Sequence, residues 1–188
     1  MFSLNLPKLL ASRVMRPLAL LAIAALAAPG AAMAASNWTS VGSTGIVDEI
    51  CHFSVLLNNQ EARLVPGIVG TCKLRYQVID TFPVPPANLR IRARIAATSP
   101  GERVEVRLFS YDLTLGNAPV QLLFLNSATA TTIGGVDLLG FRTYVSGCFA
   151  SAPTFATKSY YIEADLIRFP SLSLTLNPAL ASLTVGPC

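Results

Sequence analysis

The sequence is poor in the side chains that enzymes use for acid–base chemistry. It holds a single histidine, His52, and no Gly-x-Ser-x-Gly motif that would mark a nucleophilic serine. Cys51 precedes His52, but neighbouring residues of an extended strand point to opposite faces, so this thiol and imidazole would not share a proton. These absences favour a non-catalytic protein in which His52 is a half-exposed structural residue.

Acidic residues are also scarce, with 10 Asp and Glu in 188 residues. The carboxylates that remain available to a hydrolase are Asp48, Glu49, Asp137, Glu163 and Asp165. Glu163 and Asp165 would share one face of a strand, as a surface pair. No Asp-x-Asp-x-Asp-Gly loop predicts a calcium site, and no glycine loop carries the Lys-Ser/Thr of a phosphate site. The sequence therefore predicts no metal and no cofactor, and a secreted hydrolase is an alternative only.

No apolar run is long enough to span a bilayer. The uncharged run from Pro17 to Ala28 has 12 residues, against about 20 needed for a transmembrane helix. Basic residues precede this run, and Ala32-Met33-Ala34 offers the small residues that a signal peptidase requires. We predict a cleaved signal peptide over residues 1–34, and a mature protein that is extracytoplasmic, either periplasmic or secreted to the medium.

Loss of this leader removes most of the excess positive charge. Three of the 14 basic residues and none of the 10 acidic residues lie in the leader. The mature chain therefore has 11 basic and 10 acidic residues. A nucleic-acid ligand needs a surplus of basic charge, so we expect no nucleic-acid partner. We also expect no membrane span after cleavage.

Helical periodicity is weak, and alternation of apolar and polar residues recurs instead. The pattern predicts strands at residues 46–57, 71–79, 89–97, 103–108, 141–149, 160–168, 172–176 and 183–185. Residues 120–125 (VQLLFL) are apolar on both faces and predict a central strand. Most of these strands would have one buried and one wet face, as in antiparallel sheets. We predict an all-β fold with one disulfide-stapled domain over residues 35–188: a single antiparallel β-sandwich of about seven to nine strands. It is immunoglobulin-like only loosely, because Trp38 precedes every cysteine.

The strands at 89–97 and 103–108 flank Pro100-Gly101, a strong turn signal. A hairpin with Ala97 opposite Glu102 would place Arg94 opposite Glu105 and apolar residues opposite one another. The sequence predicts that the two strands pair.

Four cysteines follow the leader: Cys51, Cys72, Cys148 and Cys188. An even number in an exported chain predicts two disulfides. We favour Cys51–Cys72, which lie on consecutive predicted strands, and Cys148–Cys188, which would hold the C-terminal residue.

Arginines form the one concentration of charge. Arg90, Arg92 and Arg94 share a strand face, and the predicted hairpin would add Arg103 and Arg107. Such a face could bind an anionic ligand, for example an acidic polysaccharide or lipid headgroups. The other interpretation is a solvated hairpin face whose arginines guard against edge pairing.

Four stretches carry a resemblance to known proteins: residues 42–49 (GSTGIVDE), 74–78 (LRYQV), 103–108 (RVEVRL) and 160–166 (YYIEADL). Their layout resembles small exported bacterial β-sandwich proteins of unknown function. The resemblance implies a bacterial secreted β-domain and assigns no active-site residue.

We therefore predict an exported non-catalytic β-sandwich that acts as a binding or structural surface component, with a protein or polysaccharide as its ligand. Two alternatives are the secreted hydrolase and a pilus- or adhesin-like subunit completed by a partner's strand. The last alternative requires an open hydrophobic groove.

Overall fold

A computed structural model describes residues 37–96, 101–170 and 177–188. The predicted signal peptide, most of the Thr98–Gly101 turn and the expected strand at 172–176 lie outside the described residues. The signal peptide and its cleavage site stay predictions.

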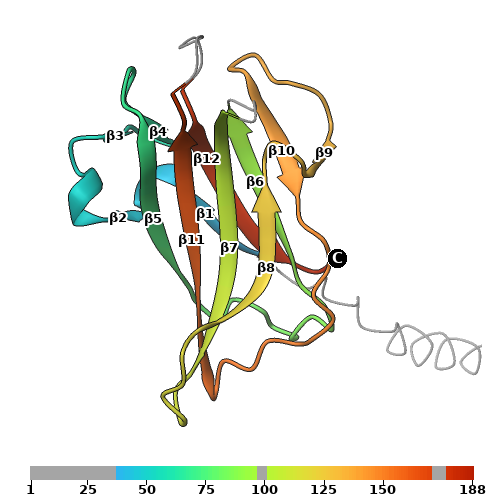
Figure 1. Ribbon diagram of the computed structural model, residues 1–188. Coiled ribbons are helices and arrows are strands. Elements are labelled where there is room, and N and C mark those ends of the chain that lie inside the picture. Colours follow the sequence, from blue (N-terminus) through green and yellow to red (C-terminus); the bar gives the residue numbers. More distant parts are fainter. Residues whose placement is uncertain (1–36, 97–100, 171–176) are drawn as a thin grey trace, which may run out of the picture. The chain divides into compact units, whose positions relative to one another are not determined.

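The described chain forms two antiparallel sheets, which confirms the predicted β-sandwich (Figure 1). The seven-stranded sheet has the order β3 (Val55–Leu57), β4 (Ala62–Leu64), β12 (Ala179–Gly186), β6 (Arg90–Ala96), β10 (Phe141–Val145) and β9 (Thr131–Ile133), with β1 (Trp38–Val41) also paired to β12. The five-stranded sheet has the order β2 (Ile46–Val47), β5 (Gly70–Val78), β11 (Lys158–Arg168), β7 (Glu102–Asp112) and β8 (Val120–Asn126). The strands exceed the predicted seven to nine because short strands such as β1, β4 and β9 carry too few residues to show an alternation.

Strand β12 is the hub of the seven-stranded sheet. One side pairs with β6 along most of its length, and the other side is shared by β4 at Ala179–Leu180 and by β1 at Ser182–Val185. The register with β6 shifts between Leu180 and Ser182, which marks a β-bulge at Ala181.

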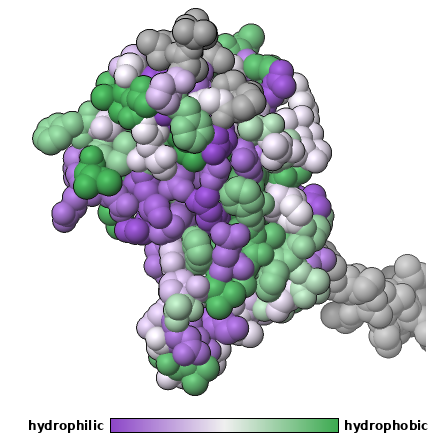
Figure 2. Space-filling view, in the orientation of Figure 1, coloured by the Kyte–Doolittle hydropathy of each residue, from purple (hydrophilic) through white to green (hydrophobic). Residues whose placement is uncertain are grey.

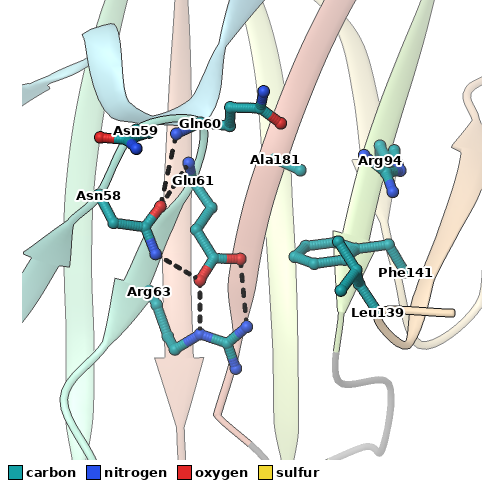
Figure 3. Close-up of a pocket in the computed structure, with 9 residues that line it drawn as sticks. All are labelled: Asn58, Asn59, Gln60, Glu61, Arg63, Arg94, Leu139, Phe141 and Ala181. Atoms are coloured by element: carbon teal, nitrogen blue, oxygen red, sulfur yellow. Dashed lines mark hydrogen bonds and ion pairs between the residues drawn. The ribbon is translucent and has the colours of Figure 1, made fainter.

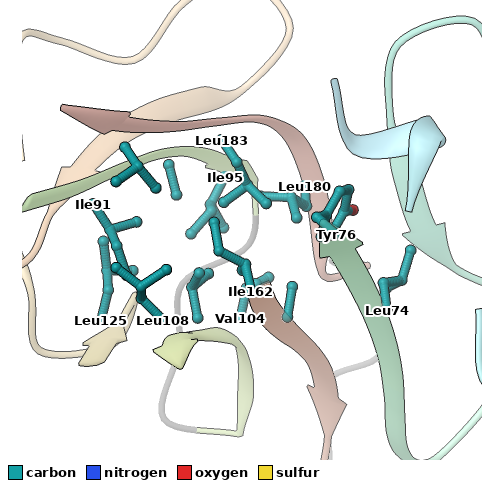
Figure 4. Packing of buried hydrophobic residues seen from close by; sticks show 14 of the residues in the cluster. Leu74, Tyr76, Ile91, Ile95, Val104, Leu108, Leu125, Ile162, Leu180 and Leu183 are labelled. Atoms are coloured by element: carbon teal, nitrogen blue, oxygen red, sulfur yellow. The ribbon is translucent and has the colours of Figure 1, made fainter. Parts of the chain in front are cut away.

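The core lies between the two sheets and is built by the inward residues of each strand. Ile91 and Ile95 of β6 meet Leu108 of β7 and Ile162 of β11, all four fully buried (Figure 4). Trp38, the only tryptophan, is buried on β1. The inward residues of both sheets are thus buried against each other within the described part of the chain.

The predicted hairpin between residues 89–97 and 102–108 is wrong. Strand β6 pairs with β12 and β10, whereas β7 pairs with β11 and β8 in the other sheet. Both strands bury one face, and this requirement is met equally well when their apolar faces pack across the sandwich. Arg94 and Glu105, expected to lie opposite each other, are therefore in different sheets.

The single early strand expected over residues 46–57 is interrupted. After β2, a 3₁₀ turn (Glu49–Cys51) follows, and the chain returns to a strand only at Val55. The Cys51 N–H donates to the Asp48 carbonyl oxygen, which closes this turn (2.8 Å). Cys51 is buried, while His52 lies on the surface and is exposed rather than half-exposed. A second 3₁₀ turn covers Gly42–Thr44, and no described helix is long and apolar enough to cross a membrane.

One end of the core holds a buried ionic group. Arg168, at the end of β11, is fully buried, and its Nε lies 3.3 Å from Oε1 of Glu102. Its guanidinium also donates to the Ile68 carbonyl oxygen (3.4 Å) and to the side-chain oxygen of Asn177. These contacts tie the starts of β5 and β7 to the segment that leads into β12.

Candidate functional site

The outer face of the seven-stranded sheet carries the predicted arginine row. Arg90, Arg92 and Arg94 lie on β6, which is a central strand, so the edge-guarding interpretation of these arginines is wrong. The nine arginines outside the predicted leader are all described, and six of them pair with a carboxylate. Arg90, Arg92 and Arg142 are the three that do not. Thr143 on β10 lies opposite Arg94 and shares the face of the row, so its neighbour Arg142 lies on the other face of β10.

Arg90 and Arg92 are only partly exposed, and the Nε–H of each is buried without an acceptor among the described residues. One other contact is made by Arg90, whose guanidinium lies 3.2 Å from the Cys148 sulfur. A buried guanidinium donor without an acceptor is costly unless an anionic or polar group meets it. These two side chains are therefore the strongest candidates for contact with a ligand.

Arg94 differs from its two neighbours, because Asp137 accepts hydrogen bonds from its guanidinium, with Nε 2.9 Å away. The guanidinium also lies 5.0 Å from the centre of the Phe141 ring. The hydrogen bond from Arg94, followed by that from the Phe141 N–H, holds the pKa of the Asp137 carboxyl below its ordinary value. The charge of Arg94 is thus neutralised within the protein.

The strand neighbours of Arg90 and Arg92 on β12 and β1 are uncharged. Thr184 lies opposite Arg92 on β12, and Thr39 lies opposite Thr184 on β1. Gly186 lies opposite Arg90, where the Asn37 side chain packs so closely that a Cβ on Gly186 would overlap it. On β12, β1 and Asn37, the neighbours of the two unpaired arginines therefore offer hydroxyl and amide groups.

The extension of the row to Arg103 and Arg107 is wrong, because both residues lie on β7 in the five-stranded sheet. Arg107 pairs with Glu105 and Asp165, and Arg103 with Glu105. Hydrophilic side chains gather on this sheet (Figure 2), but each arginine there has a carboxylate partner. This face is electrically balanced and does not favour an anion.

A pocket of about 520 Å³ lies at the Arg94 end of the row (Figure 3). Its lining residues come from the β3–β4 and β9–β10 loops and from β4, β6, β10 and β12: Asn58, Asn59, Gln60, Glu61, Arg63, Arg94, Leu139, Phe141 and Ala181. Figure 3 shows Gln60 and Glu61 on one side and Phe141 and Arg94 on the other. The bulged residue Ala181 lies between them and, with the adjoining Phe141, forms an apolar floor.

The β3–β4 loop is held by its own side chains. Asn58 donates to Oε1 of Glu61 (2.9 Å), and Arg63 donates to both oxygens of Glu61 (3.0 and 3.1 Å). Burial alone would raise the pKa of Glu61, but the hydrogen bonds from Arg63 and Asn58 outweigh it and hold that pKa below its ordinary value. The exposed side-chain amides of Asn59 and Gln60 make no hydrogen bond to the described part of the protein. The loop thus presents two uncommitted amides on a fixed turn.

The carboxylates proposed for a hydrolase do not form a catalytic pair. Glu163 and Asp165 share the outer face of β11, as predicted, but Glu163 pairs with Lys73 (2.7 Å) and Arg75 (2.9 Å), and Asp165 pairs with Arg107. Burial raises the pKa of Glu163, but the hydrogen bonds from Lys73 and Arg75 outweigh it and leave that pKa below its ordinary value. A general acid needs a raised pKa, so this arrangement gives the hydrolase no support.

The other three candidates are Asp48, Glu49 and Asp137, and none of them completes a catalytic pair with Glu163 or Asp165. Asp48 pairs with Arg75 on the same face of the five-stranded sheet (2.8 Å), and Glu49 is exposed on its turn. Asp137, bonded to Arg94, is in the seven-stranded sheet's β9–β10 loop. Among the described residues, no group of three or more histidine, cysteine or acidic side chains is placed to hold a metal ion.

The cysteines are arranged in the two predicted pairs, but only one pair is bonded. Cys148 and Cys188 form a disulfide. Cys51 and Cys72 are thiols in this structure, both buried and in contact, so their predicted bond is not formed in it. Burial, and next the hydrogen bond with Cys51, raises the pKa of the Cys72 thiol to about 12.

We predict that Cys51 and Cys72 become a disulfide in the protein recovered from the extracytoplasmic fraction, because the two thiols already touch. Alkylation in denaturant without reductant should then leave no modified cysteine, and mass spectrometry should find a peptide that joins Cys51 to Cys72. Alkylated Cys51 and Cys72 beside an intact Cys148–Cys188 bridge would contradict this prediction, and so would a Cys51–Cys148 link.

No protein-family model and no curated protein matches this chain. Among solved structures, the fold is similar to a carbohydrate-binding module, TmCBM27, which was studied for specific mannan recognition. The TM-score is 0.35 at 12% sequence identity, over 79% of this chain and 87% of that module. A likeness this remote carries no information about the ligand.

Sequence reasoning found the arginine row but missed the pocket. Asn58-Asn59 was recognisable only as a turn signal, since amides are common in turns for backbone reasons. Nothing in the sequence spacing shows that this loop lies across the sheet face from Phe141 and Arg94.

Proposed function

We propose that this protein is an exported, non-catalytic binding protein whose outer seven-stranded face binds an anionic ligand. The observation that carries the proposal is the state of Arg90 and Arg92. They are the only two arginines on that face without a carboxylate partner, and each has a buried Nε–H without an acceptor among the described residues. A carboxylate, sulfate or phosphate group at the exposed part of each guanidinium would supply the missing charge partner.

Other features support the same proposal. The Cys148–Cys188 disulfide fits an oxidising compartment outside the cytoplasm. The candidate carboxylates are held in ion pairs, which suits a binding role better than hydrolysis. The pilus-like alternative needs an open groove, and the inner faces of the described strands are buried against each other.

The first test removes both unpaired arginines. The oxidised protein should bind polygalacturonate and dextran sulfate but not uncharged dextran, and binding should weaken as salt is added. Arg90→Gln with Arg92→Gln should lower the affinity by about tenfold or more, because charge-assisted hydrogen bonds are lost. Isothermal titration calorimetry measures both effects.

The matched control for the single variants Arg90→Gln and Arg92→Gln is Arg142→Gln, which also removes one positive charge, from an arginine on the other face of β10. It should leave affinity within about twofold, since exposed charges contribute little. If Arg142→Gln lowered the affinity as much as Arg90→Gln or Arg92→Gln alone, only the net charge of the protein would matter. The proposed binding face would then be wrong.

A further inference from the structure

The arginine row and the pocket are parts of one continuous track. Arg94 is a member of the row on β6 and also lines the pocket. From Arg90 to Arg94 the strand advances about 13 Å at the usual rise of an antiparallel strand. The pocket extends the track beyond Arg94 toward the β3–β4 loop (Figure 3).

The two ends of the track differ in charge. At the row, Arg90 and Arg92 are cationic and form no ion pair with a carboxylate of the described residues. At the pocket, every charge is balanced, because Arg63 pairs with Glu61 and Arg94 with Asp137. One end thus favours an anionic group and the other favours an uncharged polar group.

The groups that remain uncommitted in the pocket are suited to hydroxyls. The amides of Asn59 and Gln60 each offer both a donor and an acceptor, as a sugar hydroxyl requires. The apolar floor at Ala181 and Phe141 suits the carbon-bound face of a ring. A small anion would use the arginines and leave these amides without a role.

We propose that the ligand of this track is a single chain of an acidic polysaccharide, with its acidic groups on Arg90 and Arg92 and the hydroxyls of a further sugar residue in the Asn59–Gln60 pocket. This inference rests on the proposed function and adds the class of ligand and its direction along β6. One chain satisfies both ends because it carries acidic groups and hydroxyls along one line.

A lipid surface fits the same track less well. Arg90 and Arg92 are only partly exposed, and their Nε atoms are buried, so these side chains lie along the sheet instead of projecting from it. A planar layer of headgroups contacts projecting side chains first. A flexible chain can lie down on the sheet and enter the pocket.

The test measures how affinity depends on the length of the ligand. Galacturonate oligomers from the dimer to the octamer are titrated into the oxidised protein. Affinity should rise until the oligomer spans the track and then become constant. Asn59→Ala with Gln60→Ala should remove this rise, lowering the affinity of long oligomers about tenfold while leaving the dimer unchanged.

The control pair is Asn117→Ala with Gln121→Ala, two exposed amides of the β7–β8 region, which should bind every oligomer as the parent protein does. Asn58 is not substituted, because its side chain holds the loop together.

Each other outcome overturns a different statement. Affinity that depends on Arg90 and Arg92 but not on length, or not on Asn59 and Gln60, would overturn the polysaccharide track and leave the proposed function standing. Arginine-dependent binding to phosphatidylglycerol vesicles that exceeds binding to the octamer would replace the polysaccharide by a lipid surface. An absence of binding to all anionic probes would overturn the proposed function itself.

Discussion

Replacement of Arg168 by alanine is expected to lower the free energy of unfolding by about 3–5 kcal/mol, the usual cost of removing one partner from a buried ion pair. Arg168 is fully buried and Glu102 is 4% exposed, so the carboxylate would be left in the core without its partner. The Ile68 carbonyl oxygen and the Asn177 side chain would also lose a donor. Urea unfolding followed by far-ultraviolet circular dichroism measures the change.

Two further variants separate the buried charge from a general loss of packing. Arg142→Ala removes an exposed arginine and should change stability by less than about 0.5 kcal/mol. Arg168→Met combined with Glu102→Leu removes both charges at similar volume and should recover most of the lost stability. If Arg168→Ala were as mild as Arg142→Ala, the charge of Glu102 would not depend on Arg168.

The second large effect is expected from the Cys148–Cys188 disulfide. Cys148→Ser with Cys188→Ser should lower the free energy of unfolding by about 4 kcal/mol in the chain-entropy model for a loop of this length. The bridge spans 40 residues and joins the segment after β10 to the segment after β12. The Cys188 N–H also donates to the side chain of Asn88 just before β6, so the bridge holds three segments together (3.0 Å).

The same denaturation experiment with reductant separates this bridge from a second one. Reduction of the parent protein should cause the loss seen in the double serine variant plus any loss from opening a Cys51–Cys72 bond. Reduction of the double serine variant should cause a further loss only where Cys51 and Cys72 are joined. If the free energy of unfolding of the double serine variant were less than about 1 kcal/mol below that of the parent, packing around β12 and not the bridge would stabilise this region.

The bridge also bears on ligand binding, because the Arg90 guanidinium lies against the Cys148 sulfur. The double serine variant should therefore bind anionic polymers more weakly than its loss of stability alone explains, when measured far below its unfolding temperature.

Alternation identified the main strands of the sandwich from the sequence. The predicted ranges 71–79 and 160–168 correspond to β5 and β11 within two residues. The apolar run 120–125 does form β8, but β8 is an edge strand, so its predicted central position is wrong. Burial of every second side chain is a local property, so the sequence records it directly. The choice of partner strand is not a local property. The predicted pairing of β6 with β7 was wrong because their patterns fit a hairpin and a contact across the sandwich equally well.

The same limit explains the partial success at the candidate site. Arg90, Arg92 and Arg94 share a face because they alternate along one strand. The different state of Arg94 depends on Asp137, which lies 43 residues away in the β9–β10 loop, and no spacing rule links the two. Arg103 and Arg107 were grouped with the row only through the predicted hairpin. Because that hairpin is not formed, their assignment to the row is also wrong.

The hub position of β12 sets the order in which the protein can fold. All three of its partners, β1, β4 and β6, precede it along the chain. Because chains are made from the N-terminus, these three strands exist for a time with open edges and no central strand between them. The seven-stranded sheet is therefore completed in a late step between residues far apart in the sequence, which predicts slow folding. Until then the open strand edges can aggregate, so we expect folding to depend on chaperones.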